Sequence, residues 1–423
     1  MQHNRPIAGS TDRDLPLASD ENTQGQPPEQ ELVQSDKKRS TGWDILWLFL
    51  LTRVLLVLVT YFGYILLTQA KYSNAPVDIS TLIASWDQWD AKRYLNIALR
   101  GYNPATYDLA FFPLFPLLIV IFGYPFGTGS YFVIGMILSN LALLGTLFFL
   151  YTLAKELGGE QTGRRTLLYL CIFPTAFFFF TAYNESLFLF FTIGGFLALR
   201  RQRWWLAGLA GGLSALTRNA GLLFVIPFLY ELWIYWQPLK THLWSKRTGH
   251  FLVRAVIPIM LVPLGTLLYC LYNWQITGNP IAFASIQYHW ARYLSFPWVG
   301  IWQNIKQVFW KQPFGSFYQV HSLIDLSMTL GFIALIILGW RKLHASYNLW
   351  LAILFLYVLV TPSVGQADAL ISNQRFVLEM FPAFITLALL GQRYPRLHQA
   401  LLWIFPAFLS ILSLLFLLGK WMV

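Results

Sequence analysis

Long stretches of apolar residues, interrupted by short polar segments, follow one another along almost the whole chain. A helix needs about 20 apolar residues to cross the ~30 Å hydrocarbon core of a bilayer, and many of these stretches approach that length. The sequence therefore predicts an all-α polytopic membrane protein, since a backbone in lipid must satisfy its hydrogen bonds internally. We expect about eleven spans, at 43–68, 130–154, 166–182, 185–199, 204–217, 219–236, 255–275, 321–340, 347–361, 375–391 and 399–418.

Charged side chains are scarce, and the basic ones gather between the apolar stretches. Asp, Glu, Lys and Arg form 12% of the 423 residues, about half the share found in soluble domains. The formal net charge of +11 is spread over short clusters, without a basic face that carries stacking aromatics, which excludes nucleic-acid binding. Both cysteines, Cys171 and Cys270, lie inside apolar stretches, and we expect free thiols that pack in the interior.

Residues 1–41 are polar and rich in Gln, Asp, Glu and Pro, which predicts a disordered tail ahead of a multi-pass membrane domain at 42–423. Basic residues at 37–39 place this tail in the cytoplasm, and the basic clusters between later spans then fall on the same side. Two loops, 70–129 and 276–320, reach the extracytoplasmic side and are long enough to form a site.

This topology requires the segment 110–127 to enter the membrane without crossing it. Pro113 and Pro116 lie three residues apart in this segment, and a proline inside a helix removes a hydrogen bond and breaks or kinks it. We therefore expect a broken or re-entrant helix here. The alternative is that 110–127 crosses the membrane and that 204–236 forms a single bent span.

The segment Ser85–Arg100 is amphipathic when it is wound as a helix at 100° per residue. Asp90 falls inside the apolar face of this helix, close to Tyr94, and Asp87 lies near the other side of that face. A carboxylate that faces the buried side costs free energy unless it is paired or used for chemistry. Asp90 is therefore the candidate general base, and the alternative is a helix-capping or salt-bridged acid beside Arg93.

Further polar residues collect at the extracytoplasmic ends of the predicted spans. Charged groups at membrane depth face a cavity or a partner in most membrane proteins, so these residues are functional candidates. The alternatives are helix capping for the acids and Asn184, snorkelling for the span-end arginines, and lipid anchoring for the aromatic second loop. The candidate substrate-binding residues are Asp87, Tyr94, Asn184, Glu185, Arg218, Trp290, Arg292, Gln374 and Arg375.

A base on an amphipathic helix and arginines at span ends suit group transfer from a lipid-phosphate donor. The acid would take a proton from an acceptor hydroxyl, while Arg218 or Arg375 would hold the departing phosphate. Nucleotide-sugar donors are scarce outside the cytoplasm. We therefore expect an enzyme that uses a lipid-linked donor.

The run WDAKRYLNIALRGY (89–102), followed by AFFPLFP (110–116), closely resembles the PIG-V family of GPI mannosyltransferase 2 type and its bacterial relatives. Other blocks resemble that family in the same order, namely NESLF (184–188), TRNAGLL (217–223), TGNPIAF (277–283) with QYHWAR (287–292), and QRFVLEMFPAF (374–384). The resemblance implies a GT-C-type glycosyltransferase. Such an enzyme moves mannose from a polyprenyl-phosphate-mannose donor on the extracytoplasmic face, with inversion at the anomeric carbon.

The resemblance also implies roles for individual residues. Asp90 matches the acid of the family's Trp-Asp motif, whereas Asp87 belongs to an additional Trp-Asp pair that the motif does not require. Arg218 takes the place of the family's arginine, although the following residues here read Asn219-Ala220-Gly221. The compact loops are similar to those of a bacterial relative, which implies a bacterial inner membrane and a glycolipid or other cell-envelope acceptor.

Three alternatives stay open. The donor sugar can be another one, such as glucose or arabinose, because only the resemblance points to mannose. A lipid-linked sugar transporter or flippase is a different class, but transporters often contain internal repeats and none is evident here. A non-catalytic scaffold would not need Asp90 on an apolar face. No metal ligand set is predicted, since His289 and His321 are far apart in sequence, although one or two acids could hold Mg²⁺ or Mn²⁺.

Overall fold

The computed structural model describes residues 29–68, 76–237, 252–366 and 368–420. Across these residues it contains only helices and loops, apart from one isolated β-bridge between Arg292 and Ser363. The predicted all-α class is therefore confirmed. The chain divides into two compact units, 1–43 and 44–423, and the second unit contains every candidate site residue.

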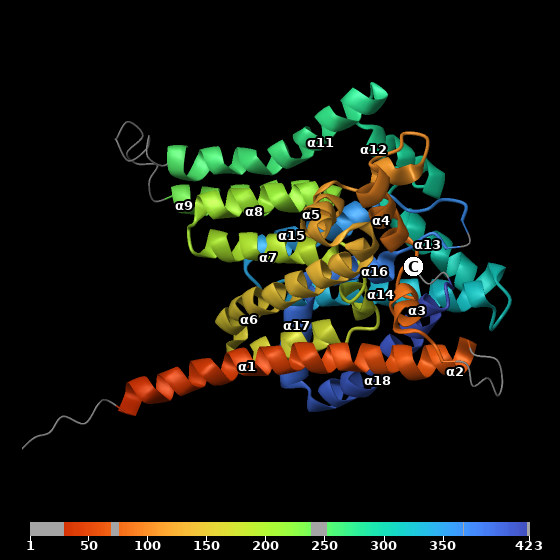
Figure 1. Ribbon diagram of the computed structural model, residues 1–423. Coiled ribbons are helices and arrows are strands. Elements are labelled where there is room, and N and C mark those ends of the chain that lie inside the picture. The colour runs from red at the N-terminus through yellow and green to blue at the C-terminus, as the bar shows by residue number, and fades with distance from the viewer. Residues whose placement is uncertain (1–28, 69–75, 238–251, 367, 421–423) are drawn as a thin grey trace, which may run out of the picture. The chain divides into compact units, whose positions relative to one another are not determined.

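The α-helices follow one another with short connections, many of them single 3₁₀ or π-helical turns (Figure 1). Helix α1 begins at Glu29, inside the tail predicted for 1–41, and the earlier part of that tail lies outside the described residues. The helices are α1 (Glu29–Leu58), α2 (Ile65–Thr68), α3 (Ile79–Ala84), α4 (Asp90–Arg100), α5 (Leu114–Gly123), α6 (Tyr131–Cys171), α7 (Glu185–Arg200), α8 (Trp204–Thr217), α9 (Val225–Trp236), α11 (Leu261–Thr277), α12 (Ala282–Ser285), α13 (Pro297–Lys306), α14 (Phe317–Gly339), α15 (Ala345–Leu359), α16 (Asn373–Phe376), α17 (Phe381–Arg393) and α18 (Pro395–Leu417).

Several of these helices are long and apolar enough to cross a membrane, so the chain is a multi-pass membrane protein, as predicted. By length and composition the described residues contain six such helices, or seven if Asn373–Glu379 and Phe381–Arg393, which are bent by 82°, form one span. The predicted count of eleven is not confirmed, because α7 and α8 have 16 and 14 residues, fewer than the roughly 20 of a straight crossing. The six are Thr41–Thr68, Thr128–Cys171, Asn219–Trp236, Val253–Thr277, Phe317–Gly339 and Pro395–Leu417.

Helix α6 is two helical arms joined by a sharp reversal. Gly158 and Gly159 have non-helical dihedral angles, and Gly159 has φ +80°, a conformation that favours glycine. Gly163 packs against the side chain of Tyr151, although a straight helix would separate these residues by about 18 Å. The second arm ends at Cys171, so the span predicted for 166–182 gives way to a turn and a short 3₁₀ helix, Ala176–Phe179.

The proline-containing segment 110–127 forms a short helix. Pro113 immediately precedes α5 and Pro116 lies in its first turn, where a missing N–H costs no intrahelical hydrogen bond. The ten residues of α5 extend about 15 Å, half of the hydrocarbon core. This length agrees with the broken segment predicted here.

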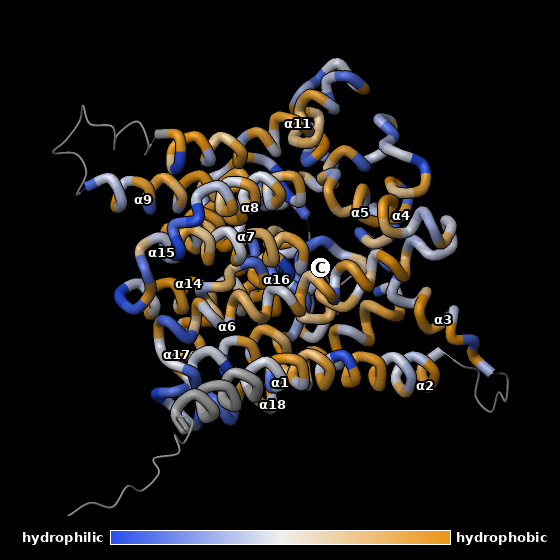
Figure 2. The backbone as a smooth tube through the Cα atoms, turned by 60° about the vertical axis from the view of Figure 1, so that its left-hand side comes forward, coloured by the Kyte–Doolittle hydropathy of each residue, from blue (hydrophilic) through white to orange (hydrophobic). Residues whose placement is uncertain are grey.

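The helices bury a large aromatic core and leave apolar side chains on the outside. Phe177, Phe178 and Phe179 are almost completely buried, whereas Trp47 and Trp403 are largely exposed. Figure 2 shows hydrophobic residues along the helices and hydrophilic residues mainly at helix ends and in the connecting loops. Exposed apolar surface on this scale is what a helical protein presents to lipid.

Candidate active site

The Trp-Asp segment forms a tight turn instead of the continuous helix predicted for 85–100. Helix α4 begins only at Asp90, because Trp89 has φ 53° and ψ −112°, which a right-handed helix does not allow. A backbone of this kind costs about 1–3 kcal/mol and persists only where the surroundings fix it. Helix periodicity alone does not reveal such a break.

Buried polar contacts hold this turn on both sides. Trp86 Nε1 donates a hydrogen bond to Thr60 Oγ1 at 3.0 Å. On the other side, the backbone N–H of Asp90 donates to Tyr183 Oη at 3.2 Å, and Tyr183 Oη donates to the Gln88 carbonyl at 3.2 Å. These contacts orient the Asp90 side chain at the first position of α4.

The apolar face predicted for α4 is buried against α5. Ala91, Tyr94 and Ile97 lie on that face and are buried. The Tyr94 ring meets the Phe111 and Phe115 rings edge-on, with centroid distances of 5.2 and 5.1 Å. Edge-to-face pairs of this kind stabilise packing beyond the area that they bury. The helix that carries Asp90 is therefore fixed along one side.

The Asp90 carboxylate is paired with an arginine that lies 285 residues further along the chain. Arg375 Nη1 lies 2.5 Å from Asp90 Oδ2, and the two side chains are 12% and 23% exposed. The partner considered from the sequence, Arg93, instead lies 3.7 Å from Asp108. Asp90 is therefore salt-bridged, but to a residue that no local pattern identified.

Two further carboxylates extend this pair into a buried network. Glu185 Oε1 lies 2.8 Å from Arg218 Nη1 and 3.4 Å from Arg375 Nε, so Glu185 joins the two arginines. Glu379 Oε1 lies 2.6 Å from Arg218 Nη1, and Asn184 Oδ1 accepts a hydrogen bond from the same nitrogen at 3.2 Å. Arg218 and Arg375 thus extend toward buried carboxylates and not toward the membrane surface, so they are not snorkelling side chains.

Three guanidinium groups surround the single aromatic ring of Phe376. The guanidinium carbons of Arg218, Arg292 and Arg375 lie 5.4, 5.2 and 5.2 Å from the ring centroid. Cations are attracted to the face of an aromatic ring, more strongly where water is excluded. The Phe376 ring therefore offsets part of the electrostatic repulsion among the three guanidinium groups.

Arg292 differs from the other two arginines because no carboxylate among the described residues forms an ion pair with it. Its Nη2 donates to the Ile371 carbonyl at 3.4 Å. Removal from water, with a smaller contribution from nearby Arg375, lowers the pKa of Arg292 to about 10. The group is still positively charged at neutral pH. It is a cation available to an anionic ligand.

These groups line a cavity of about 370 Å³. The elements that contribute to it include α4, the residue just before α7, the turn after α8, the 286–294 segment and α16 (Figure 1). Seven of the sequence-predicted residues line it, namely Asp90, Tyr94, Asn184, Arg218, Trp290, Arg292 and Arg375.

Three predicted residues do not line the cavity. Glu185 is 1% exposed and lies behind the arginines that it joins. Gln374 is completely buried, and its backbone N–H donates to Asp325 Oδ1. Asp87 lies in the turn before α4, where burial raises the pKa of its carboxyl. Asp87 caps no helix, since the residues that precede α3 and α4 are Asp78 and Trp89.

Helix capping by Asn184 and lipid anchoring by Trp290 were the alternatives to a role in the site. Asn184 precedes α7 but its side chain makes no capping hydrogen bond, and Nδ2 donates instead to the Thr217 carbonyl at 2.8 Å. Trp290 lines the cavity and meets the Tyr107 ring at 5.6 Å. Neither residue is explained by capping or lipid anchoring alone.

Sequence reasoning missed several residues of the cavity. Glu379 and Phe376 lie in the block that contains Arg375, and Tyr288 and Tyr357 line the cavity as well. The signal for Glu379 was present, because a carboxylate four residues after Arg375 in an apolar run faces the same side of a helical turn. No local signal marks Phe376 among so many phenylalanines.

The acids in and behind the cavity are paired with arginines, so they do not form a ready metal site. Asp90, Glu185 and Glu379 each have a guanidinium within 4 Å. Among the described residues, the group with metal-ligand spacing is His321, Asp325 and Asp368, and none of these three lines the cavity.

Known proteins resemble part of the chain. No protein-family model matches it. The chain is 32% identical over 162 residues to GPI alpha-1,6-mannosyltransferase 2 of Rattus norvegicus, a match that covers 35% of this chain and 32% of that protein. It is 26% identical over 156 residues to GPI mannosyltransferase 2 of Schizosaccharomyces pombe, covering 35% and 32%. The matched region spans about a third of these curated relatives, and the similarity expected from the motifs is confirmed there.

Solved structures align over more of the chain at lower identity. ArnT from Cupriavidus metallidurans bound to undecaprenyl phosphate aligns with a TM-score of 0.44 and 17% identity, over 82% of this chain and 62% of that chain. The archaeal oligosaccharyltransferase AglB from Archaeoglobus fulgidus, in complex with an inhibitory peptide and a dolichol-phosphate, aligns with a TM-score of 0.43 and 12% identity, over 89% and 55%.

Proposed function

We propose that this protein is a GT-C-type membrane glycosyltransferase that moves mannose from a polyprenyl-phosphate-mannose donor to an acceptor hydroxyl on the extracytoplasmic face. The observation that carries the proposal is the cavity in which the Asp90 carboxylate lies beside the arginines on Phe376. The similarity to enzymes named mannosyltransferases supports the sugar. We further propose a bacterial inner-membrane protein with a cytoplasmic N-terminus.

The donor phosphate binds at the arginines. Arg292 offers a guanidinium without a carboxylate partner, and a guanidinium binds phosphate through short, charge-assisted hydrogen bonds. The phosphate also competes with Asp90 for Arg375, which lies on the same ring. Donor binding therefore releases the Asp90 carboxylate from its ion pair at the time when a base is needed.

The transfer step uses the Asp90 carboxylate as the base and the arginines as the phosphate-binding groups. The acceptor hydroxyl oxygen attacks the anomeric carbon of mannose, and its proton passes to Asp90. The bond between that carbon and the phosphate oxygen breaks, and the electron pair leaves with the polyprenyl phosphate. The arginines stabilise the negative charge that develops on the departing phosphate. Attack from the face opposite the phosphate inverts the anomeric carbon.

Glu185 and Glu379 hold the arginines in place. Both are almost completely buried, and together they contact Arg218 twice and Arg375 once. A site positioned by buried ion pairs needs little rearrangement when charge develops. We assign these two acids a positioning role, since Glu185 does not line the cavity and Glu379 is almost completely buried against Arg218, whereas the Asp90 side chain is 23% exposed.

The proposal is tested with purified full-length protein in nanodiscs, given polyprenyl-phosphate-mannose or its glucose analogue together with a lipid extract as acceptor source. Wild type should transfer mannose, and Asp90→Asn should lose about 100-fold or more in kcat. Donor binding should be kept or tightened, because the Asp90 charge no longer competes for Arg375. Asp44→Asn makes the same chemical change at a half-exposed carboxylate that pairs with Arg164, and it should remain active.

Other outcomes contradict defined parts of the proposal. Equal transfer by Asp90→Asn would show that the base is a different residue. Transfer from the glucose donor alone would show that the sugar is wrong. Movement of intact lipid-linked sugar across proteoliposome membranes without transfer would indicate a flippase.

A further inference from the structure

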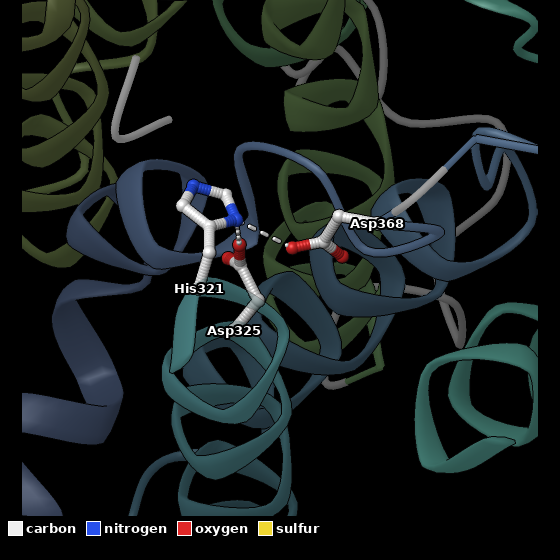
Figure 3. A group of neighbouring side chains, drawn as sticks. All are labelled: His321, Asp325 and Asp368. Atoms are coloured by element: carbon white, nitrogen blue, oxygen red, sulfur yellow. Dashed lines mark hydrogen bonds and ion pairs between the residues drawn. The ribbon is translucent and has the colours of Figure 1, made fainter. Parts of the chain in front are cut away.

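A second buried cluster of ionisable side chains lies outside the cavity. His321 and Asp325 are four residues apart on α14 and therefore share one face of that helix, and Asp368 belongs to the segment before α16 (Figure 3). All three are at most 5% exposed. The structure thus brings together an imidazole and two carboxylates, of which His321 and Asp368 are 47 residues apart in the chain.

The two carboxylates are arranged in the same way. Oδ1 of Asp368 accepts hydrogen bonds from Asn304 Nδ2 and from the Leu370 N–H, both at 2.9 Å. Oδ1 of Asp325 accepts one from the Gln374 N–H, also at 2.9 Å. The two Oδ2 atoms face inward, toward Nδ1 of His321 (Figure 3). Neutral N–H donors therefore bind the two Oδ1 atoms. The two Oδ2 atoms remain available to a ligand bound between the three side chains.

His321 is the basic group that contacts both carboxyl groups of this cluster. No lysine or arginine among the described residues forms an ion pair with Asp325 or Asp368. With both carboxylates ionised, a protonated His321 leaves one negative charge in excess. Asp325 Oδ2 has no hydrogen-bond partner by distance and angle, and it lies 3.6 Å from His321 Nδ1. Buried charge that is only partly compensated is costly. A divalent cation between the three groups would neutralise both carboxylates.

The spacing of the inner atoms fits such a cation. With bonds of about 2.0–2.2 Å, tetrahedral ligands of one zinc ion lie roughly 3.3–3.6 Å apart. The three ligand atoms all lie within 4.8 Å of one another, and His321 Nδ1 and Asp325 Oδ2 are 3.6 Å apart. Asp368 Oδ2, at 2.7 Å from Nδ1, would have to recede by about 0.6 Å to reach that spacing.

We propose that His321, Asp325 and Asp368 bind a divalent transition-metal ion, for which one nitrogen and two carboxylate ligands are most typical of Zn²⁺. Its role is to position the neighbouring segment rather than to act on substrate, since none of its ligands lines the cavity. Asp325 binds the backbone of Gln374, and the next residue is Arg375. The metal would therefore fix the segment that carries an arginine of the cavity.

The test is metal binding by the full-length protein in detergent, after treatment with a chelator. Zn²⁺ and, separately, Mn²⁺ are added, the free metal is removed, and the content is measured by mass spectrometry. Wild type should keep about one Zn²⁺ per chain, and Asp325→Asn and Asp368→Asn should each bind at least about tenfold more weakly. Asp78→Asn changes an exposed acid near α3 and should bind as wild type.

A spectroscopic and a stability measurement complete the test. Co²⁺ added to wild type should give visible absorption that Asp368→Asn lacks, and Zn²⁺ should raise the Tm of wild type alone. If chelator-treated wild type retains no Zn²⁺ or Mn²⁺ above Asp368→Asn, the cluster is a histidine–carboxylate ion pair and the proposal is wrong. This result does not depend on sugar transfer, so the metal site and the glycosyltransferase function are tested independently. Wild type alone decides the case if the variants do not fold.

Discussion

Replacing Arg292 by Gln tests the proposed phosphate site without disturbing the ion pairs around it. Arg218 and Arg375 cannot be removed without leaving buried carboxylates unpaired. Arg292 has no carboxylate partner among the described residues, and its side chain contacts the Ile371 carbonyl and the Phe376 ring. Arg292→Gln should therefore fold, with a loss of about 2 kcal/mol from the desolvated cation–π contact.

The expected effect on donor affinity follows from the lost charge. A hydrogen bond to a charged group contributes about 1.5–3 kcal/mol, which corresponds to a rise of about 10- to 150-fold in the donor KM. The assay is initial-rate mannose transfer over a range of donor concentrations, together with donor binding and Tm. Arg292→Lys, which keeps the charge but not the planar fork, should fall between wild type and Arg292→Gln.

Arg93→Gln provides the matched control. Arg93 is 39% exposed, pairs with Asp108 and does not line the cavity. Its donor KM should stay within about twofold of wild type. An Arg292→Gln enzyme with wild-type KM and donor affinity would refute the assignment of the phosphate to this arginine. An equal rise in both variants would attribute the effect to general loss of positive charge.

Three further outcomes are expected. Tyr183→Phe removes both hydrogen bonds that the phenol makes around the Trp-Asp turn and should lower kcat about 5- to 150-fold with donor KM unchanged; equal kcat would show that packing alone fixes the turn. Glu185→Gln leaves the two arginines undercompensated and should destabilise the fold by about 3–5 kcal/mol, seen as a lower Tm in detergent. Cysteines placed at Asn103 and Gln161 should react with impermeant reagents from opposite sides of the membrane, and labelling from one side would contradict the topology.

The helical class and the location of polar residues followed from the sequence, because both depend on local chemistry. Apolar length and charge scarcity are readable in a single segment, and so is the cost of a carboxylate on the apolar face of α4. The same reasoning drew attention to Asn184, Arg218 and Arg375 at the ends of apolar runs. These residues line one cavity in the structure.

The sequence did not reveal which distant side chains contact one another. Asp90 and Arg375 are 285 residues apart, and nothing local to either residue identifies the other. The break at Trp89 was also missed, since the helical periodicity of 85–100 continues through it while long-range contacts from Tyr183 fix the backbone. His321 gave no metal signal because its proposed co-ligands are aspartates, one of them on a distant segment.

The gathering of three arginines on Phe376 bears on how a catalytic cycle would end. A polyprenyl-phosphate sugar is a phosphodiester with one negative charge, whereas the phosphate monoester left after transfer carries about −1.5 to −2 at neutral pH. Guanidinium groups that hold the donor therefore hold the spent carrier more tightly. Release of polyprenyl phosphate, rather than sugar transfer, would then limit turnover, and added polyprenyl phosphate would inhibit in competition with the donor.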